Sequence, residues 1–155
     1  MKATDSAAQA PDMALASAKA RALEAFAEVG AALDAASGID GVLHVIARKA
    51  RALVGVERCS IYLRDDEAGL FRGHVTEGGN RELAVYVKRS LAGMQADGMT
   101  RELLRTRQPV IIADAHNDPR IIRSNACFWN IRSMLAVPMV FGDNVIGVIY
   151  LDDIE

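Results

Sequence analysis

The stretch SMLAVPMVFGDNVIGVIYLDD, residues 133–153, constrains the fold of this chain more than any other part of its sequence. It consists of two strongly apolar runs of strand length on either side of the turn Gly142-Asp143-Asn144. Gly142 and Asn144 both tolerate positive φ angles, so the turn can reverse the chain tightly. The pattern therefore predicts an antiparallel β-hairpin close to the end of the sequence.

A second hairpin is predicted earlier in the chain. Residues 57–66 read ERCSIYLRDD, residues 65–69 have the composition of a turn, and LFRGHVTEGG at residues 70–79 is the expected return strand. Side chains of different character alternate along the first strand, which predicts two distinct faces. These faces are Cys59, Ile61 and Leu63 on one side and Arg58, Ser60 and Tyr62 on the other.

Helical periodicity precedes this hairpin. Larger apolar residues recur at a spacing of three or four between residues 13 and 36, which predicts an amphipathic helix there. Residues 1–12 are small and polar, and we expect a disordered leader. A second helix is predicted at residues 41–53, with Asp40 as its N-cap. The apolar stripe of the first helix consists of Leu15, Ala22, Phe26, Val29 and Leu33.

The rest of the chain is predicted to form short elements. Residues 80–98 are compatible with a short helix, an irregular strand or both. Residues 99–108 predict a helix stopped by Pro109, residues 110–114 a strand, and residues 121–130 a short helix or lid. This order of elements indicates an α+β domain with an antiparallel sheet. We expect the long helices to cover one face of the sheet and the short segments to roof the other.

Composition excludes several classes of function. The 155 residues suffice for one domain with a real core, and a hydrophobic share of 51% with a net charge of −2 is typical of globular proteins. No basic stripe with interleaved aromatic residues is present, so we expect no direct contact with nucleic acid. Cys59 and Cys127 lack the spacing of a zinc site or a disulfide framework, which favours the reducing cytoplasm. We find no secretory signal and no apolar run near the ~20 residues that span a membrane.

Four motifs in order give the sequence a resemblance to a GAF domain, a small-molecule sensor module of signalling proteins. They are ERCSIYL, TEGG, DGMTRELLRTRQPVIIADAHNDPR and IRSMLAVPMVFGDNVIGVIYLDD, and the resemblance covers roughly residues 40–153. The resemblance implies a six-stranded antiparallel sheet with helices on one face and a lidded ligand pocket on the other. The family usually adds a helix after the last strand. Residues 37–155 are therefore expected to be a GAF domain without that helix, cut from a longer protein with a downstream output domain.

The resemblance also implies where a ligand binds. It places the pocket on the sheet face that carries Ser60 and Tyr62, where small hydroxyls can orient a ligand while apolar neighbours exclude water. Residues 99–103 and 121–129 are expected to form a lid, in which two adjacent aromatic residues can close over a planar or apolar ligand. The complete set of candidates is Ser60, Tyr62, His74, Thr76, Met99, Thr100, Leu103, Asp114, His116, Asn125, Phe128, Trp129 and Met134.

The identity of the ligand and of any cofactor stays open. Members that bind cyclic nucleotides have an Asn-Lys pair at the end of the last strand, where this chain reads LDDIE. They also often have an aromatic residue at the position of Thr76, so both departures count against cyclic nucleotides. A bilin is disfavoured because Cys127 in the lid lacks a neighbouring histidine. Haem would need an inward-pointing histidine, for which His74 and His116 are the candidates.

The favoured function is a regulatory sensor domain without enzymatic activity, in a bacterial transcription regulator or signalling protein. We expect it to form a homodimer through the helix at residues 13–36, with no metal and no membrane contact. One alternative is a ligand-free interaction module whose pocket is filled by Phe128 and Trp129. The other is a redox enzyme similar to the free methionine-R-sulfoxide reductases, with Cys127 as its thiolate. The stretch ADGMTREL lacks the second cysteine that those enzymes have nearby.

Overall fold

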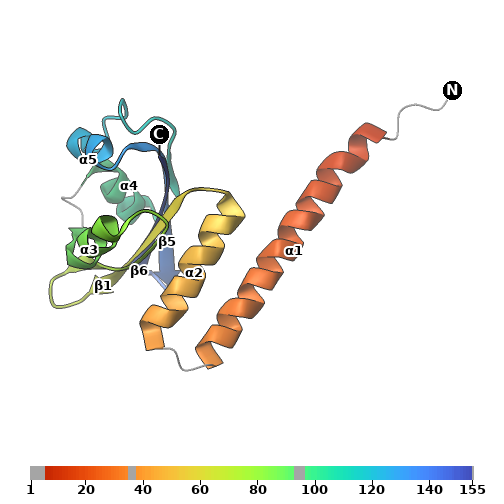
Figure 1. Cartoon of the computed structure of the whole chain (residues 1–155), viewed down its shortest axis with the longest axis horizontal. Coiled ribbons are helices and arrows are strands. Elements are labelled where there is room, and N and C mark those ends of the chain that lie inside the picture. Colours follow the sequence, from red (N-terminus) through yellow and green to blue (C-terminus); the bar gives the residue numbers. More distant parts are fainter. Residues whose placement is uncertain (1–5, 35–37, 93–96, 155) are drawn as a thin grey trace.

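A computed structural model describes residues 6–34, 38–92 and 97–154. It contains a six-stranded antiparallel sheet with helices on both faces, which confirms the predicted α+β class. The elements are α1 (Ser6–Asp34), α2 (Gly38–Val54), β1 (Arg58–Asp65), β2 (Leu70–Glu77), α3 (Arg81–Arg89), β3 (Leu91–Ala92), α4 (Gly98–Thr106), β4 (Val110–Ile112), α5 (Arg123–Phe128), β5 (Ile131–Phe141) and β6 (Asn144–Ile154) (Figure 1).

The C-terminal hairpin contributes strand β6 to the centre of the sheet. The strand order is β3-β2-β1-β6-β5-β4, so β6 pairs with β5 on one side and with β1 on the other. In the turn of this hairpin Gly142 has a φ of 58°, as predicted, but Asn144 is already the first residue of β6. The prediction of a positive φ at Asn144 was wrong. A two-residue turn with glycine in its first central position needs a positive φ at that glycine only.

Helix α2 covers one face of the sheet. Leu43 and Ala47 of α2 pack in a buried cluster with Cys59 and Ile61 of β1 and with Leu151 of β6. The two β1 residues belong to the face that the sequence predicted to carry Cys59, Ile61 and Leu63. Burial of these apolar side chains therefore fixes which face of β1 points towards α2, and leaves the face with Ser60 and Tyr62 for the other side.

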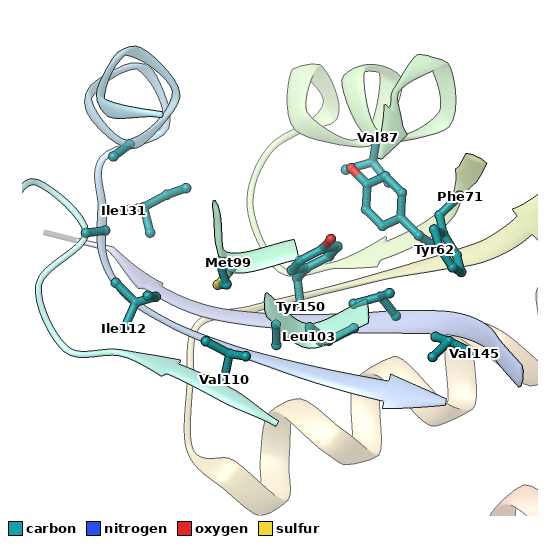
Figure 2. Close-up of a cluster of buried hydrophobic side chains, with 14 of the residues drawn as sticks. Tyr62, Phe71, Val87, Met99, Leu103, Val110, Ile112, Ile131, Val145 and Tyr150 are labelled. Atoms are coloured by element: carbon teal, nitrogen blue, oxygen red, sulfur yellow. The ribbon is translucent and has the colours of Figure 1, made fainter. Parts of the chain in front are cut away.

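The opposite face of the sheet is covered by the short helices α3, α4 and α5, which we call the roof. Val87 of α3 and Met99 and Leu103 of α4 pack in a second buried cluster with Tyr62 of β1 and Tyr150 of β6. Figure 2 shows these side chains on one side of the sheet and α2 on the other. The predicted two-sided sheet is thus confirmed.

The region that the sequence left ambiguous contains a helix and a short strand. The side chain of Asn80 accepts a hydrogen bond of 2.9 Å from the backbone nitrogen of Leu83 and so caps α3. Strand β3 follows and pairs with β2 at the edge of the sheet. Asp97 caps α4 in the same way, with a bond of 2.6 Å from the backbone nitrogen of Thr100. Residues 93–96, between β3 and this cap, lie outside the described residues.

The boundaries of the two N-terminal helices differ from the prediction. Helix α1 begins at Ser6 rather than at residue 13, so residues 6–12 of the expected leader are helical, whereas residues 1–5 and 35–37 lie outside the described part. Helix α2 begins at Gly38, where φ is 69°. Asp40 therefore lies within the first turn of α2 and not at its N-cap, a position where a carboxylate still favours the helix dipole.

Helix α1 packs on α2 and lies on the side of α2 that faces away from the sheet (Figure 1). Its side chain Ala25 is 8% exposed, whereas Leu23 and Phe26 are 70% and 74% exposed. The apolar stripe therefore does not pack on the sheet, and part of it faces solvent. Among the described residues, no helix combines the length and the apolar character needed to cross a membrane.

Candidate functional site

A cavity of about 320 Å³ lies between the sheet and the roof. Strands β1, β5 and β6 form its floor, α3 and α5 form its walls, and the first residues of α4 close one end. This volume falls at the lower end of the range for small-molecule sites, roughly 300–1,000 Å³. Aliphatic residues supply much of the lining, among them Leu83, Val87, Met99, Ile121, Ile131 and Met134.

Aromatic side chains are concentrated at this cavity. The chain has three tyrosines and one tryptophan, and all four line it: Tyr62, Tyr86, Tyr150 and Trp129. The rings of Tyr62 and Tyr150 meet edge to face with centroids 5.3 Å apart on the floor. Those of Tyr86 and Trp129 lie 5.1 Å apart and join α3 to the end of α5. With aromatic residues making up only 5% of the chain, this concentration indicates a site suited to flat ligands.

A buried ion pair forms part of the cavity wall. Arg58 on β1 donates from Nε to Oδ2 of Asp152 on β6 at 2.6 Å, and its terminal nitrogen contacts the same oxygen. The guanidinium also donates to the backbone carbonyl of Trp129 at 3.0 Å. Burial raises the pKa of the Asp152 carboxyl, and the adjacent Arg58 charge opposes this effect. Arg58 therefore ties two central strands to the end of the roof helix α5.

Two hydrogen-bonded pairs of hydroxyl groups lie beneath the roof, and we call them hydroxyl relays. Ser90 Oγ donates to the carbonyl of Val87 at 2.8 Å and lies 2.7 Å from the hydroxyl of Tyr62. Burial raises the pKa of Tyr62 to about 12. The Tyr62 hydroxyl is therefore protonated at neutral pH. Because Ser90 has already given its one proton to the carbonyl, Tyr62 is the donor between the two hydroxyls.

The second relay involves the cap of α4. Thr100 Oγ1 donates to Oδ2 of Asp97 at 3.1 Å and lies 2.8 Å from the hydroxyl of Tyr150. Burial raises the pKa of Tyr150 as well. A carboxylate only accepts, so the Thr100 proton goes to Asp97 and Tyr150 donates to Thr100. Nearby, Ser60 donates to Thr76 at 2.9 Å.

The structure brings six of the thirteen predicted site residues to the cavity. The sheet contributes three of them, the start of α4 one and the α5 segment two. Three more lie directly behind this lining. Thr76 and Thr100 bond to hydroxyls of lining residues, and Leu103 is fully buried in the roof-side core. The six that line the cavity are Ser60, Tyr62, Met99, Asn125, Trp129 and Met134.

His74 does not line the cavity. In the pairing of β1 with β2, Ile61 lies opposite Val75 and Tyr62 opposite Gly73, so His74 is the extra residue of a β-bulge. Its Nδ1 lies 3.3 Å from Oδ1 of Asp40 on α2. The bulge breaks the alternation that would place His74 and Thr76 on the same face, so His74 lies away from the predicted ligand site.

Phe128 also lies outside the cavity. Its side chain is 67% exposed, and its ring packs edge to face on Trp129 with centroids 4.7 Å apart. The predicted contact of Phe128 with a ligand finds no support in this geometry, because α5 directs only its other side towards the sheet. The ring instead supports Trp129 from outside.

Asp114 and His116 belong to a surface turn and do not line the cavity. Asp114 accepts hydrogen bonds from the backbone nitrogens of His116 and Asn117 and from the Asn117 side chain. The bond from that side chain is the main reason that the pKa of Asp114 is lowered. His116 Nδ1 lies 3.6 Å from Sγ of Cys127, which is exposed. Asp114 therefore organises the loop before α5, and neither candidate haem histidine reaches the cavity.

Several lining residues were missed by the sequence analysis. Arg58 shares the strand parity of Ser60 and Tyr62, so the alternation that identified these two also indicated Arg58. Tyr86 and Ser90 were missed because α3 was not assigned, although the Asn80 cap followed by an apolar spacing of four was the signal for this helix. Within the part of the chain that the structure describes, no group of three or more His, Cys, Asp or Glu side chains is placed to hold a metal ion.

Comparisons with known proteins agree with this architecture. A family model of the GAF domain matches residues 38–155. The GAF domain from the Acinetobacter phosphoenolpyruvate-protein phosphotransferase is 19% identical, with a TM-score of 0.66 over 84% of this chain and 75% of that one. The GAF domain from a phosphoenolpyruvate-protein phosphotransferase of Coxiella burnetii is 16% identical, with a TM-score of 0.69 over 86% and 77%.

An enzyme has the same fold. The free methionine-R-sulfoxide reductase from Neisseria meningitidis, solved with its substrate, is 17% identical, with a TM-score of 0.65 over 99% of this chain and 78% of that one. A search of curated proteins found no match. At these identities the structural likeness shows the fold alone, but the family model covers most of the sequence, including all six strands. The chain therefore belongs to the GAF domain family of regulatory domains.

Proposed function

We propose that this domain is a sensor that binds a small organic molecule in the cavity between sheet and roof. The observation that carries the proposal is the position of the cavity, which lies between the sheet and the three short helices of the roof and is lined by the chain's tyrosines and its tryptophan. A ligand there contacts the sheet and the roof at once. It therefore stabilises the arrangement of roof and sheet in which it makes both contacts, relative to one in which it does not. The size of this effect is the difference between the ligand's binding free energies in the two arrangements.

The Arg58 contacts provide a route from the ligand to the rest of the protein. Arg58 joins Asp152 on β6 to the carbonyl of Trp129, whose ring lines the cavity. A ligand that shifts Trp129 alters the hydrogen bond from Arg58 to the Trp129 carbonyl. Because Arg58 also binds Asp152, the shift is passed to the C-terminal part of β6. We propose that β6 passes it to an output domain of a transcription regulator or another cytoplasmic signalling protein, without direct contact of this domain with nucleic acid.

Dimerisation through α1 is the second part of the proposal. The helix exposes Leu15, Leu23 and Phe26 and buries Ala25. Leu15 and Ala22 are seven residues apart and Phe26 follows at a spacing of four, as in the seam of a coiled coil. A second copy of the chain that covers this seam would remove the large apolar side chains from water. Two sensor domains would then be coupled through paired α1 helices.

The ligand-free alternative finds less support in the geometry. It required Phe128 and Trp129 to fill the space under the roof. Phe128 lies outside, Trp129 forms a wall, and about 320 Å³ remains between them and the sheet.

A redox function is favoured by one observation, the contact of Cys127 with His116. In such a reaction the thiolate attacks the sulfoxide sulfur, a thioether leaves, and Cys127 becomes a sulfenic acid that a second thiol must reduce. Cys59 cannot serve, because it is fully buried on the α2 side and burial raises the pKa of its thiol to about 12. Dithiothreitol can itself reduce a sulfenic acid, so it serves as the second thiol in the test. Reduction of methionine sulfoxide by the wild type but not by Cys127→Ser would support the redox function, whereas the sensor proposal expects neither protein to reduce it and both to bind a ligand equally.

A thermal-shift screen with pooled metabolites tests the sensor proposal. We expect at least one pool to raise the melting temperature, since a ligand at a hundred times its Kd stabilises the folded state by about 2.7 kcal/mol. Asn125→Phe places a ring at a lining position of α5, whereas Ser124→Phe changes its exposed neighbour outside the lining. The shift should persist in Ser124→Phe and disappear in Asn125→Phe. The proposal fails if no pool stabilises the wild type, or if both variants respond equally.

A further inference from the structure

The hydroxyl relays restrict the chemistry of the ligand, an inference that rests on the proposed function. Tyr62 gives its proton to Ser90, and Tyr150 gives its proton to Thr100, because the second hydroxyl of each pair is already committed to an acceptor. Both tyrosines line the cavity. Their oxygens therefore have lone pairs left for a ligand but no proton to give.

A third hydroxyl on the floor behaves in the same way. Ser60 lines the cavity and donates to Thr76 behind it. Its oxygen is thus also an acceptor towards the cavity. A free hydroxyl group can both donate and accept a hydrogen bond. The hydroxyls of Tyr62, Tyr150 and Ser60 each give their proton to a neighbouring side chain, so towards the cavity they can only accept. A ligand that bonds to them has to supply O–H or N–H groups.

The charges of the wall point in the same direction. The described lining residues include two carboxylates, Asp97 and Asp152, and one cation, Arg58. Arg58 is already paired with Asp152 and with the Trp129 carbonyl. An anionic ligand would thus meet acceptor oxygens on the floor and a net negative wall, with the Asn125 amide and the Tyr86 hydroxyl among the lining side chains left to donate. To reach Arg58 it would have to break a buried ion pair, which costs several kcal/mol.

We propose that the cavity takes a small flat organic molecule that carries O–H or N–H donors and no negative charge. Its ring lies against Trp129 and Tyr86, and its donors point to the oxygens of Tyr62 and Tyr150. Carboxylates, phosphates and other acceptor anions are excluded from this class.

Three naphthalenes of nearly equal size test the inference: 2-naphthol, with an O–H donor; 2-methoxynaphthalene, without one; and 2-naphthoate, an acceptor anion. Binding is followed by fluorine NMR of protein that carries fluorotryptophan at Trp129, the single tryptophan of the chain and a lining residue. We expect 2-naphthol to bind about tenfold more tightly than either of the others, since one satisfied buried donor accounts for a difference of this order. This comparison uses the wild-type protein and needs no variant.

Two variants assign the effect to the relays. Tyr62→Phe and Tyr150→Phe each remove one acceptor oxygen, and each should reduce the preference for 2-naphthol over 2-methoxynaphthalene while affinity for the ether stays the same. The inference is overturned if 2-naphthoate binds as tightly as 2-naphthol, if neither variant alters the preference, or if none of the three shifts the Trp129 signal. A metabolite that stabilises the protein but is an anion would refute this ligand class and leave the sensor proposal intact.

Discussion

Arg58 and Asp152 lie opposite each other on the adjacent strands β1 and β6, and their side chains form a buried ion pair in the wall of the cavity. The side chains are 6% and 9% exposed. Removing only one of the two charges is strongly destabilising, because the other charge then stays buried without its partner. The pair therefore links the stability of the sheet to the geometry of the site.

Asp152→Ala should lower the free energy of unfolding by about 3–5 kcal/mol, because it leaves the buried Arg58 charge uncompensated. Urea unfolding followed by circular dichroism measures this. Asp153→Ala is the matched control, because the neighbouring Asp153 only makes a 3.4 Å contact with the exposed Arg132 and should cost about 1 kcal/mol or less. The double variant Arg58→Met/Asp152→Leu should recover much of the loss. Equal losses in the two single aspartate variants would contradict the role of the pair.

Tyr62 should make stability fall at alkaline pH. The folded protein holds the Tyr62 proton up to a pKa of about 12, whereas the ordinary value is 10.0. The folded state therefore binds more protons between these values, and its stability is full below pH 10 and declines as the pH rises towards 12. Tyr62→Phe lacks this contribution, which is roughly 3 kcal/mol.

The free energy of unfolding of the wild type minus that of Tyr62→Phe should consequently decrease as the pH increases from 9 to 11. This range is chosen to bracket the ordinary tyrosine pKa of about 10. Denaturant unfolding at several pH values provides the measurement. Cys59, another buried group that titrates in this range, lies on the α2 side of the sheet and is present in both proteins, so its effect cancels in the difference. A difference that stays constant or increases with pH would show that folding does not raise the pKa of Tyr62.

Gly73→Ala should displace α3 from β2. A Cβ atom at Gly73 would lie 1.9 Å from the carbonyl oxygen of Val87, which is backbone and cannot swing aside. Overpacking of this kind costs about 1–3 kcal/mol, and it should also open the cavity wall that α3 provides. Gly30→Ala on α1 is the control, since nothing lies within 4 Å of its added Cβ and alanine favours a helix. Unfolding midpoints that fall equally in both variants would contradict the close contact.

Phe26→Glu should abolish dimerisation if α1 is the dimer interface. The side chain is exposed, so the substitution removes apolar surface from the seam and adds a charge without disturbing the core. Light scattering after size-exclusion chromatography should give a dimer for the wild type and a monomer for the variant. Glu24→Lys changes the charge of α1 but keeps the apolar residues, and it should remain dimeric. A monomeric wild type at high micromolar concentration would refute the proposed assembly.

The sheet and its two faces were predictable because their signals are local. The alternation of Cys59, Ile61 and Leu63 with Ser60 and Tyr62 has the strand period, and burial of one set fixes the direction of the other. The C-terminal hairpin was equally clear, since its two apolar runs flank a turn with a glycine. These features follow from side-chain periodicity alone, and the structure confirms them.

The site was only partly predictable because its remaining features depend on tertiary contacts. The bulge at His74 turned that side chain towards α2, which no local pattern in β2 indicates. The pairing of Arg58 with Asp152 joins residues far apart in the sequence, and the donor direction of Tyr62 depends on Ser90 beyond α3. Phe128 and Trp129 are neighbours in the sequence, but the orientation of α5 places only Trp129 at the cavity.

Native mass spectrometry after incubation with a pooled metabolite library tests most directly whether the cavity is a ligand site. We expect the wild type and Ser124→Phe to retain one small organic molecule per chain and Asn125→Phe to appear at its bare mass. A wild type that carries nothing, or an adduct retained equally by all three proteins, would contradict binding under the roof.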